Sequence, residues 1–238
     1  EENKERFAKF ADKIISYKVT DTPDDFMNLT NTGFFNGELD KVYDYIRTQT
    51  NRFNRTTQPD YGRDFFQKES VRRALVDCKD EDIIIISDAD EIPNPEILKE
   101  LTTLSLDNTI YSLAQPMYSY YLNMLCDDNW FGSKLGLYKN VKKLSFNEIR
   151  GDSSLTTKLA NGGWHFSFMG GEEMVKTKIT SYSARDLVNE NVLASIQSNI
   201  DNDQDVFFRG KLTRVEIDNT YPQYILNNLN KYDKMIKR

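Results

Sequence analysis

Four consecutive isoleucines, Ile83 to Ile86, run directly into the acidic segment Ser87-Asp88-Ala89-Asp90-Glu91. Because apolar and polar side chains do not alternate in this run, it predicts a strand buried on both faces, as in the parallel core of an α/β sheet. An amphipathic helix is expected before it, over residues 63–78, and Asn94 with Pro95 is typical of a helix start after it. The acidic segment would then lie at the carboxyl end of a sheet strand, where open α/β sheets bind ligands.

The rest of the chain predicts shorter elements with no linker between them. Residues 20–60 are expected to form a long loop with one short helix near residues 38–48. We therefore expect one α/β domain over residues 1–238, with a mostly parallel central sheet flanked by helices. Further strands are expected at 109–122, 134–138 and 163–168, and further helices at 172–181, 187–200 and 222–237.

The charge balance excludes some classes of partner. The chain has 31 Lys plus Arg against 37 Asp plus Glu, a net charge of -6. A field of this sign disfavours non-specific binding to nucleic acid or to anionic lipid. No apolar run approaches the ~20 residues of a membrane-spanning helix. Two cysteines, Cys78 and Cys126, are too few for a disulfide framework and fit no zinc spacing. We expect neither a nucleic-acid partner nor a membrane segment in this chain.

The compartment is left open by the sequence. The chain begins with Glu1 and shows no signal peptide, so we interpret it as a processed piece. Two glycosylation sequons begin at Asn28 and Asn54, and such sites are used in a secretory pathway. The piece is expected to be either cytoplasmic or the lumenal catalytic part of a secretory-pathway enzyme.

The acidic segment is a candidate metal site. Asp88, Asp90 and Glu91 place three carboxylates within four residues, and their mutual repulsion would be relieved by a divalent cation. Oxygen ligands suit Mg²⁺ or Mn²⁺, and Mg²⁺ is commonly shared between one or two carboxylates and the phosphates of a substrate. The alternative is a solvated acidic turn at a helix start.

The single histidine, His165, lies in the segment Asn161-Gly162-Gly163-Trp164-His165-Phe166-Ser167. In a strand, His165 would share one face with Gly163 and Ser167, while the aromatic residues would enter the core on the other. Imidazole is a common ligand for Mn²⁺ and Zn²⁺. A purely structural histidine is the alternative.

Taken together, these motifs resemble glycosyltransferase family 17, which includes the enzyme that adds the bisecting N-acetylglucosamine to N-glycans. The resemblance rests on Ser87 to Pro93 followed by Gly162 to Ser167. Weaker matches support it, namely Tyr61 to Gln67, Tyr120 to Asn123, Glu173 with Lys178, and Tyr221 to Leu226. It covers most of the chain from Asp60 onward.

The resemblance implies a GT-A-type nucleotide-diphospho-sugar transferase that works with inversion at the anomeric carbon. It implies Mn²⁺ or Mg²⁺ as cofactor, a UDP-sugar such as UDP-N-acetylglucosamine as donor, and a glycan as acceptor. Carried over to this chain, Asp88 faces the ribose side of the donor and Asp90 binds the metal. His165 is the candidate for a further metal ligand, with Asp88 also assigned to the metal site.

Other residues of the site follow from the same resemblance. Arg63, Gln67 and Lys178 are assigned to donor binding, with a surface charge as the alternative for Arg63 and Lys178. Glu173 is the candidate base, with Glu172 and Asp152 as rivals, and it too has a surface charge as its alternative. The candidate acceptor residues are aromatic and have core packing as their alternative: Tyr120, Tyr121, Trp130 and Trp164.

The chain departs from the family pattern at two points. It starts close to where the family's first sheet strand would end, so either part of the donor site is absent or that strand is replaced. It also carries Ala184 where relatives commonly have a histidine. Two alternative functions remain open, a catalytically silent sugar- or nucleotide-binding module and a haloacid-dehalogenase-like phosphatase. The phosphatase family expects Thr or Val shortly after the second Asp, whereas Glu91-Ile92-Pro93 follows here.

Overall fold

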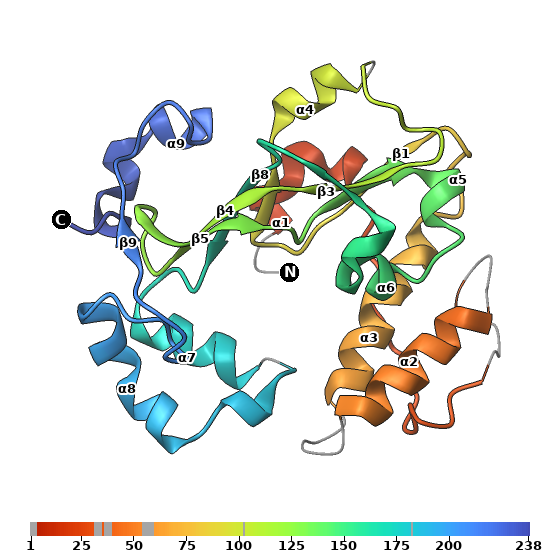
Figure 1. Ribbon diagram of the computed structural model, residues 1–238, viewed down its shortest axis with the longest axis horizontal. Coiled ribbons are helices and arrows are strands. Elements are labelled where there is room, and N and C mark those ends of the chain that lie inside the picture. Colours follow the sequence, from red (N-terminus) through yellow and green to blue (C-terminus); the bar gives the residue numbers. More distant parts are fainter. Residues whose placement is uncertain (1–3, 31–34, 36–39, 54–59, 102, 182) are drawn as a thin grey trace.

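The computed structural model describes residues 4–30, 35, 40–53, 60–101, 103–181 and 183–238. Two sheets lie side by side, with helices packed against them (Figure 1). Sheet A has the strand order β1-β6-β3-β7, and sheet B has the order β2-β8-β4-β5-β9. The strands are β1 (Ile83–Ile86), β2 (Glu91–Pro93), β3 (Ile110–Leu113), β4 (Gln115–Ser119), β5 (Met124–Trp130), β6 (Lys134–Leu137), β7 (Thr157–Leu159), β8 (Gly163–Ser167) and β9 (Thr213–Arg214).

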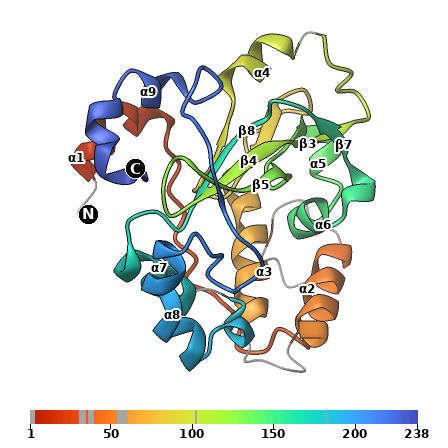
Figure 2. The same cartoon turned by 60° about the vertical axis from the view of Figure 1, so that its left-hand side comes forward.

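The helices fall into groups. Both views place α7 next to α8 and α2 next to α3, and the two pairs lie below the sheets in Figures 1 and 2, with α4 above. The α-helices are α1 (Lys4–Phe7), α2 (Asp40–Phe53), α3 (Asp60–Ser70), α4 (Pro95–Glu100), α5 (Tyr138–Val141), α6 (Phe146–Gly151), α7 (Glu172–Thr180), α8 (Glu190–Asp201) and α9 (Gln223–Leu226). Short 3₁₀ helices are η1 (Ala8–Lys13), η2 (Val71–Ala74), η3 (Ser153–Leu155), η4 (Arg185–Leu187) and η5 (Leu229–Met235).

The expected mostly parallel sheet is not what the chain forms. Among the described strands, β3 pairs with β7 and β4 with β8 in parallel, while the remaining pairs are antiparallel. The isoleucine run does not form a strand that is buried on both faces. It forms β1, an edge strand of sheet A in which Ile83 is exposed and Ile84 is buried. The fold is therefore mixed α/β, with two mixed sheets.

The two faces of sheet B pack against different parts of the chain, and the face that carries His165 positions the site. On β8 and β4, His165 lies beside Met117, and Ser167 beside Ser119. We call the side carrying these residues the front face. On the back face Tyr118, Trp164 and Phe166 pack with Tyr221 from the C-terminal region. The front face is covered by α7 and α8, whose Val175, Ile179, Val192 and Ile196 pack with Tyr120 and Met124.

Most of the local predictions are confirmed. The expected strands at 134–138 and 163–168 are β6 and β8, and the helices at 172–181 and 187–200 are α7 and α8. Asn94 caps α4 by accepting a hydrogen bond from the backbone N–H of Glu96. The helix expected at 63–78 is α3 followed by η2. The strand expected at 109–122 is divided into β3 and β4.

The C-terminal prediction is wrong, and two other predictions fall partly outside the described residues. A single helix over 222–237 is not formed, because α9 ends at Leu226 and η5 starts at Leu229. The Asn228 amide between them donates to the Tyr224 carbonyl, so a side chain competes with the helical ladder. The helix expected near 38–48 is α2, although residues 38–39 lie outside the described part. The sequon at Asn54 also lies outside it, whereas the Asn28 sequon lies in a described loop.

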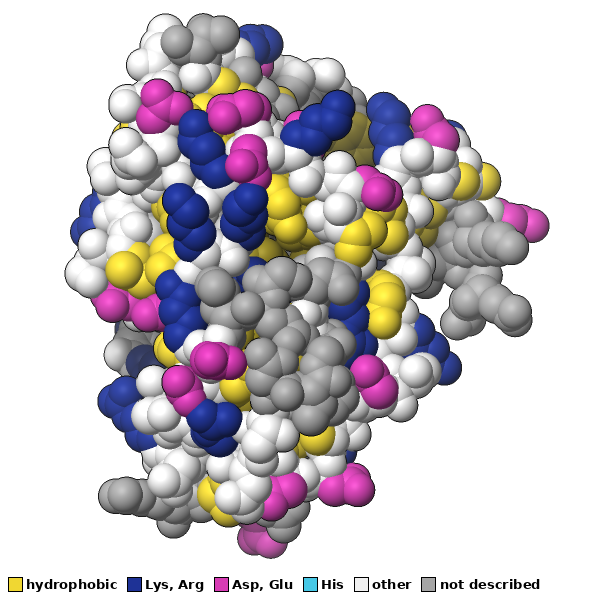
Figure 3. Space-filling model, turned by 90° about the vertical axis from the view of Figure 1, so that its right-hand side faces the viewer, with side chains coloured by type: hydrophobic (Ala, Val, Ile, Leu, Met, Phe, Trp, Pro, Cys, Tyr) yellow, Lys and Arg dark blue, Asp and Glu magenta, His cyan; other side chains and the backbone are white. Residues whose placement is uncertain are grey.

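The surface carries charges of both signs, and the two cysteines are unpaired. Lys and Arg are interspersed with Asp and Glu on the face shown in Figure 3. Cys78 and Cys126 are both free thiols. Within the described residues, no helix is long and apolar enough to cross a membrane.

Candidate active site

The acidic turn connects sheet A to sheet B. It leaves β1 after Ile86 and enters β2 at Glu91, where the backbone N–H of Glu91 donates to the Asp88 carbonyl at 3.0 Å. The backbone N–H of Phe166 donates to the Asp90 carbonyl at 2.9 Å, which ties the turn to β8. Glu91 also pairs with His165 across β2 and β8. The turn is therefore fixed against the strand that carries the histidine.

Asp90 is the meeting point of three elements. Its Oδ2 lies 3.3 Å from His165 Nε2 on β8 and 2.5 Å from Lys178 Nζ on α7. Lys178 also donates to Ser167 Oγ at 3.0 Å. Burial alone would raise the pKa of Asp90, but hydrogen bonds from His165 and Lys178 outweigh it and hold this pKa well below its usual range. Asp90 is therefore an ionised carboxylate that is 29% exposed and open to a ligand.

His165 occupies the strand position that the sequence predicts. It lies on the front face with Ser167, and it is 6% exposed. Its ring centroid is 5.0 Å from that of Trp130. Nδ1 is buried and has no hydrogen-bond partner among the described residues, so Nε2 is the nitrogen that faces the carboxylate. No histidine is visible on the face of the molecule that Figure 3 shows.

Arg150 of α6 holds the other two carboxylates of the turn. Its guanidinium lies 2.5 Å from Asp88 Oδ2 and 3.1 Å from Glu91 Oε1. Glu91 is fully buried and also accepts hydrogen bonds from Trp130 Nε1 and Ser133 Oγ. Burial would raise the pKa of Glu91, but the hydrogen bond and charge of Arg150 lower it. Glu91 is thus a structural anchor, and Asp88 is left 45% exposed at the mouth of the site.

The chain matches the sequence profile of glycosyltransferase family 17 over residues 3–212. The protein belongs to glycosyltransferase family 17. No curated protein and no solved structure matches it. Membership makes the protein a glycosyltransferase, so a sugar donor and a sugar acceptor must both reach its site.

The glycosyltransferase offers two side chains to a divalent cation. Asp90 Oδ2 and His165 Nε2 are an oxygen and a nitrogen donor that face each other across 3.3 Å, and both suit Mn²⁺. Among the described residues, no three His, Cys, Asp or Glu side chains are gathered around one point. Asp88 is turned toward Arg150 instead. The pair could supply two ligands to a divalent cation, and such a cation would compete with Lys178 for Asp90.

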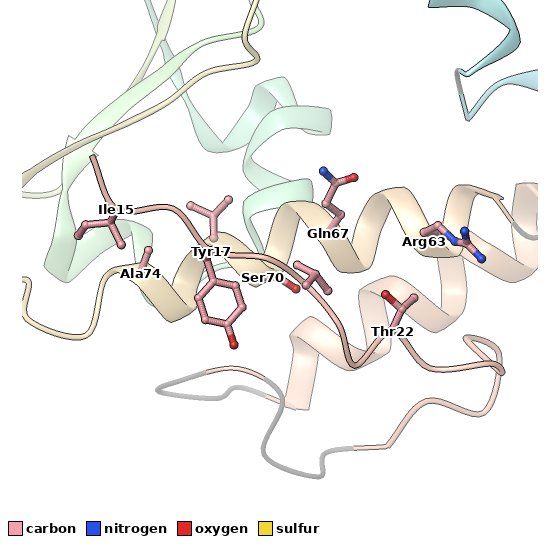
Figure 4. A pocket seen from close by; sticks show the side chains of 9 residues that line it. Ile15, Tyr17, Thr22, Arg63, Gln67, Ser70 and Ala74 are labelled. Atoms are coloured by element: carbon pink, nitrogen blue, oxygen red, sulfur yellow. The ribbon is translucent and has the colours of Figure 1, made fainter. Parts of the chain in front are cut away.

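Arg63 and Gln67 lie in a separate pocket of the glycosyltransferase. A cavity of about 520 Å³ lies between α3 and the extended segment 15–22. Figure 4 shows Arg63 and Gln67 projecting from α3, with Tyr17 and Thr22 on the neighbouring segment. No hydrogen bond or ion pair between described residues joins Arg63 or Gln67 to the acidic turn. Their role in donor binding stays a prediction.

The expected bases lie apart from Asp90. Glu173 and Glu172 are exposed in the first turn of α7. Glu173 is five residues from Lys178, which puts the two side chains on different sides of the helix. Asp152 is exposed and caps η3 by accepting from the Ser154 backbone N–H, which keeps its pKa below the usual range. The role of these carboxylates stays a prediction.

The four aromatic candidates have different surroundings. Trp164 and Tyr120 are buried, and each donates to a backbone carbonyl, that of Thr220 and of Gln204 respectively. Tyr121 lines a small pocket with Gly170 and Gly171. Trp130 is half-buried beside His165. The Trp130 ring therefore packs against the ring of the histidine.

Two cations at the site were missed by the sequence analysis. Arg150 lies in a short helix of ordinary composition, and nothing in its neighbours indicates a partner 62 residues away. Lys134 is 3% exposed on β6, and burial, together with the charge of Arg150, lowers its pKa to about 8. The available signal was the position of Lys134 at the start of a predicted strand, directly before Leu135.

Proposed function

We propose that this glycosyltransferase moves a sugar from a nucleotide-diphospho-sugar to a glycan hydroxyl, with inversion at the anomeric carbon. The observation that supports this most is the convergence of His165 and Lys178 on Asp90. An ionised carboxylate, an imidazole and an ammonium at one point form a set that can hold a diphosphate through a cation and through direct hydrogen bonds. UDP-N-acetylglucosamine is the proposed donor, on the strength of the motifs shared with the family.

A divalent cation is proposed at Asp90 and His165. When bound, Mn²⁺ or Mg²⁺ would act as a Lewis acid that stabilises the charge on the departing diphosphate. The strand pairing of His165 with Glu91 and Met117 fixes its backbone, and its ring is buried beside Trp130. Asp90 is ionised at neutral pH, so its carboxylate has no proton to lose, whereas His165 Nε2 would have to give up the proton that it donates to Asp90 before a cation binds there.

Lys178 is proposed to move between two anionic partners. Without donor, its ammonium pairs with Asp90 and is steadied by Ser167. With a cation at Asp90, the ammonium would be free to donate to a diphosphate oxygen. When the bond between the anomeric carbon and the diphosphate breaks, its electron pair stays on the diphosphate, and Lys178 would stabilise the charge on that leaving oxygen.

Asp88 is proposed to bind the ribose of the donor. Arg150 binds its Oδ2, which fixes the carboxylate plane and leaves Oδ1 free of other described partners. A carboxylate oxygen held in this way accepts a hydrogen bond from a hydroxyl. Arg63 and Gln67 are proposed to contact the nucleotide from α3, and the GT-A type of the fold is proposed with them. Glu173 and Asp152 stay candidates for the base that takes the acceptor proton.

Thermal unfolding with UDP and Mn²⁺ tests the donor site. We expect UDP and Mn²⁺ together to raise the melting temperature of the wild type more than either does alone, because bound ligand stabilises the folded state. Asp90→Asn should abolish this joint effect. Asp107→Asn is the matched control, because Asp107 is an exposed partner of Lys139. A wild-type protein whose melting temperature ignores UDP with Mn²⁺ would refute the proposed donor site.

A further inference from the structure

A third cavity opens beside His165 on the front face of sheet B. It has a volume of about 260 Å³, and we call it the Trp130 pocket. It lies between strands β4 and β5 on one side and the loop 203–212 on the other. The residues used below are Met117, Asp127, Trp130, Asp205, Arg209 and Gly210.

The position of the pocket ties it to the proposed donor site. Met117 is the direct neighbour of His165 across β4 and β8, and Asp127 is the neighbour of Met117 across β4 and β5. Strands lie about 4.8 Å apart, so the backbones of Asp127 and His165 are separated by roughly 10 Å. Trp130 bridges this interval, because it lines the pocket and its ring also contacts His165.

The walls of the pocket are firm. Asp205 is saturated, since it accepts from Arg209 Nε and Nη2 at 2.8 Å each and from two backbone N–H groups. The Trp130 indole is held by its hydrogen bond to the buried Glu91. A fixed aromatic face with a few polar groups around it is the usual lining of a small-molecule site.

Asp127 is the carboxylate that the pocket leaves available. Its Oδ1 accepts from the backbone N–H of Asn129, and Oδ2 has no partner among the described residues. The side chain is exposed, unlike the saturated Asp205 on the opposite wall. A free carboxylate oxygen next to an aromatic face can accept a hydrogen bond from a sugar hydroxyl and then its proton.

We propose that the Trp130 pocket is the acceptor subsite, where a pyranoside packs on Trp130 and gives its hydroxyl proton to Asp127. This rests on the proposed function. In the transfer step, the acceptor oxygen forms a bond to the anomeric carbon of the donor while its proton passes to Asp127 Oδ2. The bond from that carbon to the diphosphate breaks, and the electron pair leaves with the diphosphate. Asp127 then returns the proton to water.

The test separates donor binding from acceptor binding. Gly210 lines the pocket, so Gly210→Leu adds a bulky side chain at its wall, and a Cβ at this position meets no atom within 4 Å that it would clash with. The probes are methyl glycosides of mannose, N-acetylglucosamine and galactose, observed by saturation-transfer NMR in the presence of UDP and Mn²⁺. We expect a signal from at least one glycoside with the wild type and with Asp128→Asn, and no signal with Gly210→Leu. All three proteins should keep their thermal response to UDP and Mn²⁺.

Transfer kinetics test the role of Asp127. Asp127→Asn should lower the transfer rate by about 10²- to 10⁴-fold, the usual contribution of a general base, while Asp128→Asn stays close to the wild type. If Glu173→Gln causes this loss and Asp127→Asn does not, Asp127 is not the base. If the glycoside signal survives in Gly210→Leu, or is absent from a wild type that binds UDP, the subsite is refuted. A wild type that does not bind UDP with Mn²⁺ refutes the proposed function itself and the subsite with it.

Discussion

The ammonium of Lys178 lies 2.5 Å from Asp90 Oδ2, so an ion pair joins α7 to the acidic turn. Because Lys178 is 39% exposed, this pair contributes little to stability, and its value is expected in function. It places a mobile positive charge beside the carboxylate that is the proposed cation ligand.

Lys178→Met is expected to lower kcat by about 10²- to 10³-fold, because one charged donor to the leaving group is removed. Lys176→Met, on an exposed position of the same helix, is the matched control. The measurement is the initial rate of UDP release from UDP-N-acetylglucosamine with an acceptor. An equal rate for the two variants would remove Lys178 from the site.

Glu91→Gln is expected to destabilise the protein by about 3 kcal/mol, because Arg150 then keeps a buried charge with a weakened partner. Glu96→Gln should change the unfolding free energy by less than about 1 kcal/mol, since Glu96 forms an exposed pair with Lys99. Urea unfolding at neutral pH measures both. Similar losses for the two variants would contradict an anchoring role for Glu91.

Acid should destabilise the protein through Asp90 and Glu91. Both pKa values are lowered in the folded state, from 3.8 and 4.5 respectively. The folded state therefore binds fewer protons, so the stabilisation is complete above these unfolded values and is lost as the pH falls through the folded ones. The unfolding free energy, measured from pH 6 downward, should decline below about pH 4.5. This decline should be shallower in Glu91→Gln.

The lowered pKa of Lys134 predicts that the unfolding free energy rises at alkaline pH. Its pKa is lowered from 10.5 to about 8, so between these values the unfolded state binds a proton that the folded state does not. The unfolding free energy should rise over this interval by up to about 3 kcal/mol from this group. Lys134→Met should lack the rise, whereas Lys143→Met, in an exposed loop, should keep it. A wild-type curve without this rise would show that Lys134 titrates normally.

Gly132→Ala should destabilise the protein by about 1 to 3 kcal/mol, the usual cost of overpacking. The added Cβ would overlap Glu91 Oε1 and Trp130 Nε1, which are hydrogen-bonded to each other. A Cβ at Gly210 meets no atom within 4 Å, so Gly210→Ala should change the unfolding free energy by less than about 0.5 kcal/mol. Thermal unfolding compares the two. Equal melting temperatures would mean that Glu91 and Trp130 can move apart freely.

Local chemistry made part of this structure predictable. Asn94 and Pro95 start α4 as expected, because a capping side chain acts on the N–H groups next to it. The alternation in β8 placed His165 opposite Trp164 correctly, since side chains in a strand change face at each residue. The proximity of His165 to Asp90 also agrees with the sequence analysis.

The remaining features depend on contacts between distant parts of the chain. The direction of strand pairing is set by how β6 returns between β1 and β3, and the isoleucine run carries no information about it. Arg150 was missed because its partner Asp88 lies 62 residues earlier in the chain. Asp127 was missed because an exposed aspartate in a strand resembles any solvated charge until Met117 and His165 are seen beside it.

Arg150 and Lys178, which bind the carboxylates of the acidic turn, are synthesised after that turn. Asp88 and Asp90 leave the ribosome long before Arg150 and Lys178, which lie 62 and 88 residues further along. Until then, the nascent chain carries closely spaced negative charges with no cationic partner from α6 or α7. Contacts of such long sequence separation form slowly, because the intervening chain must first be ordered. We therefore expect the site to be assembled late in folding, after sheet A has joined β1, β6 and β3.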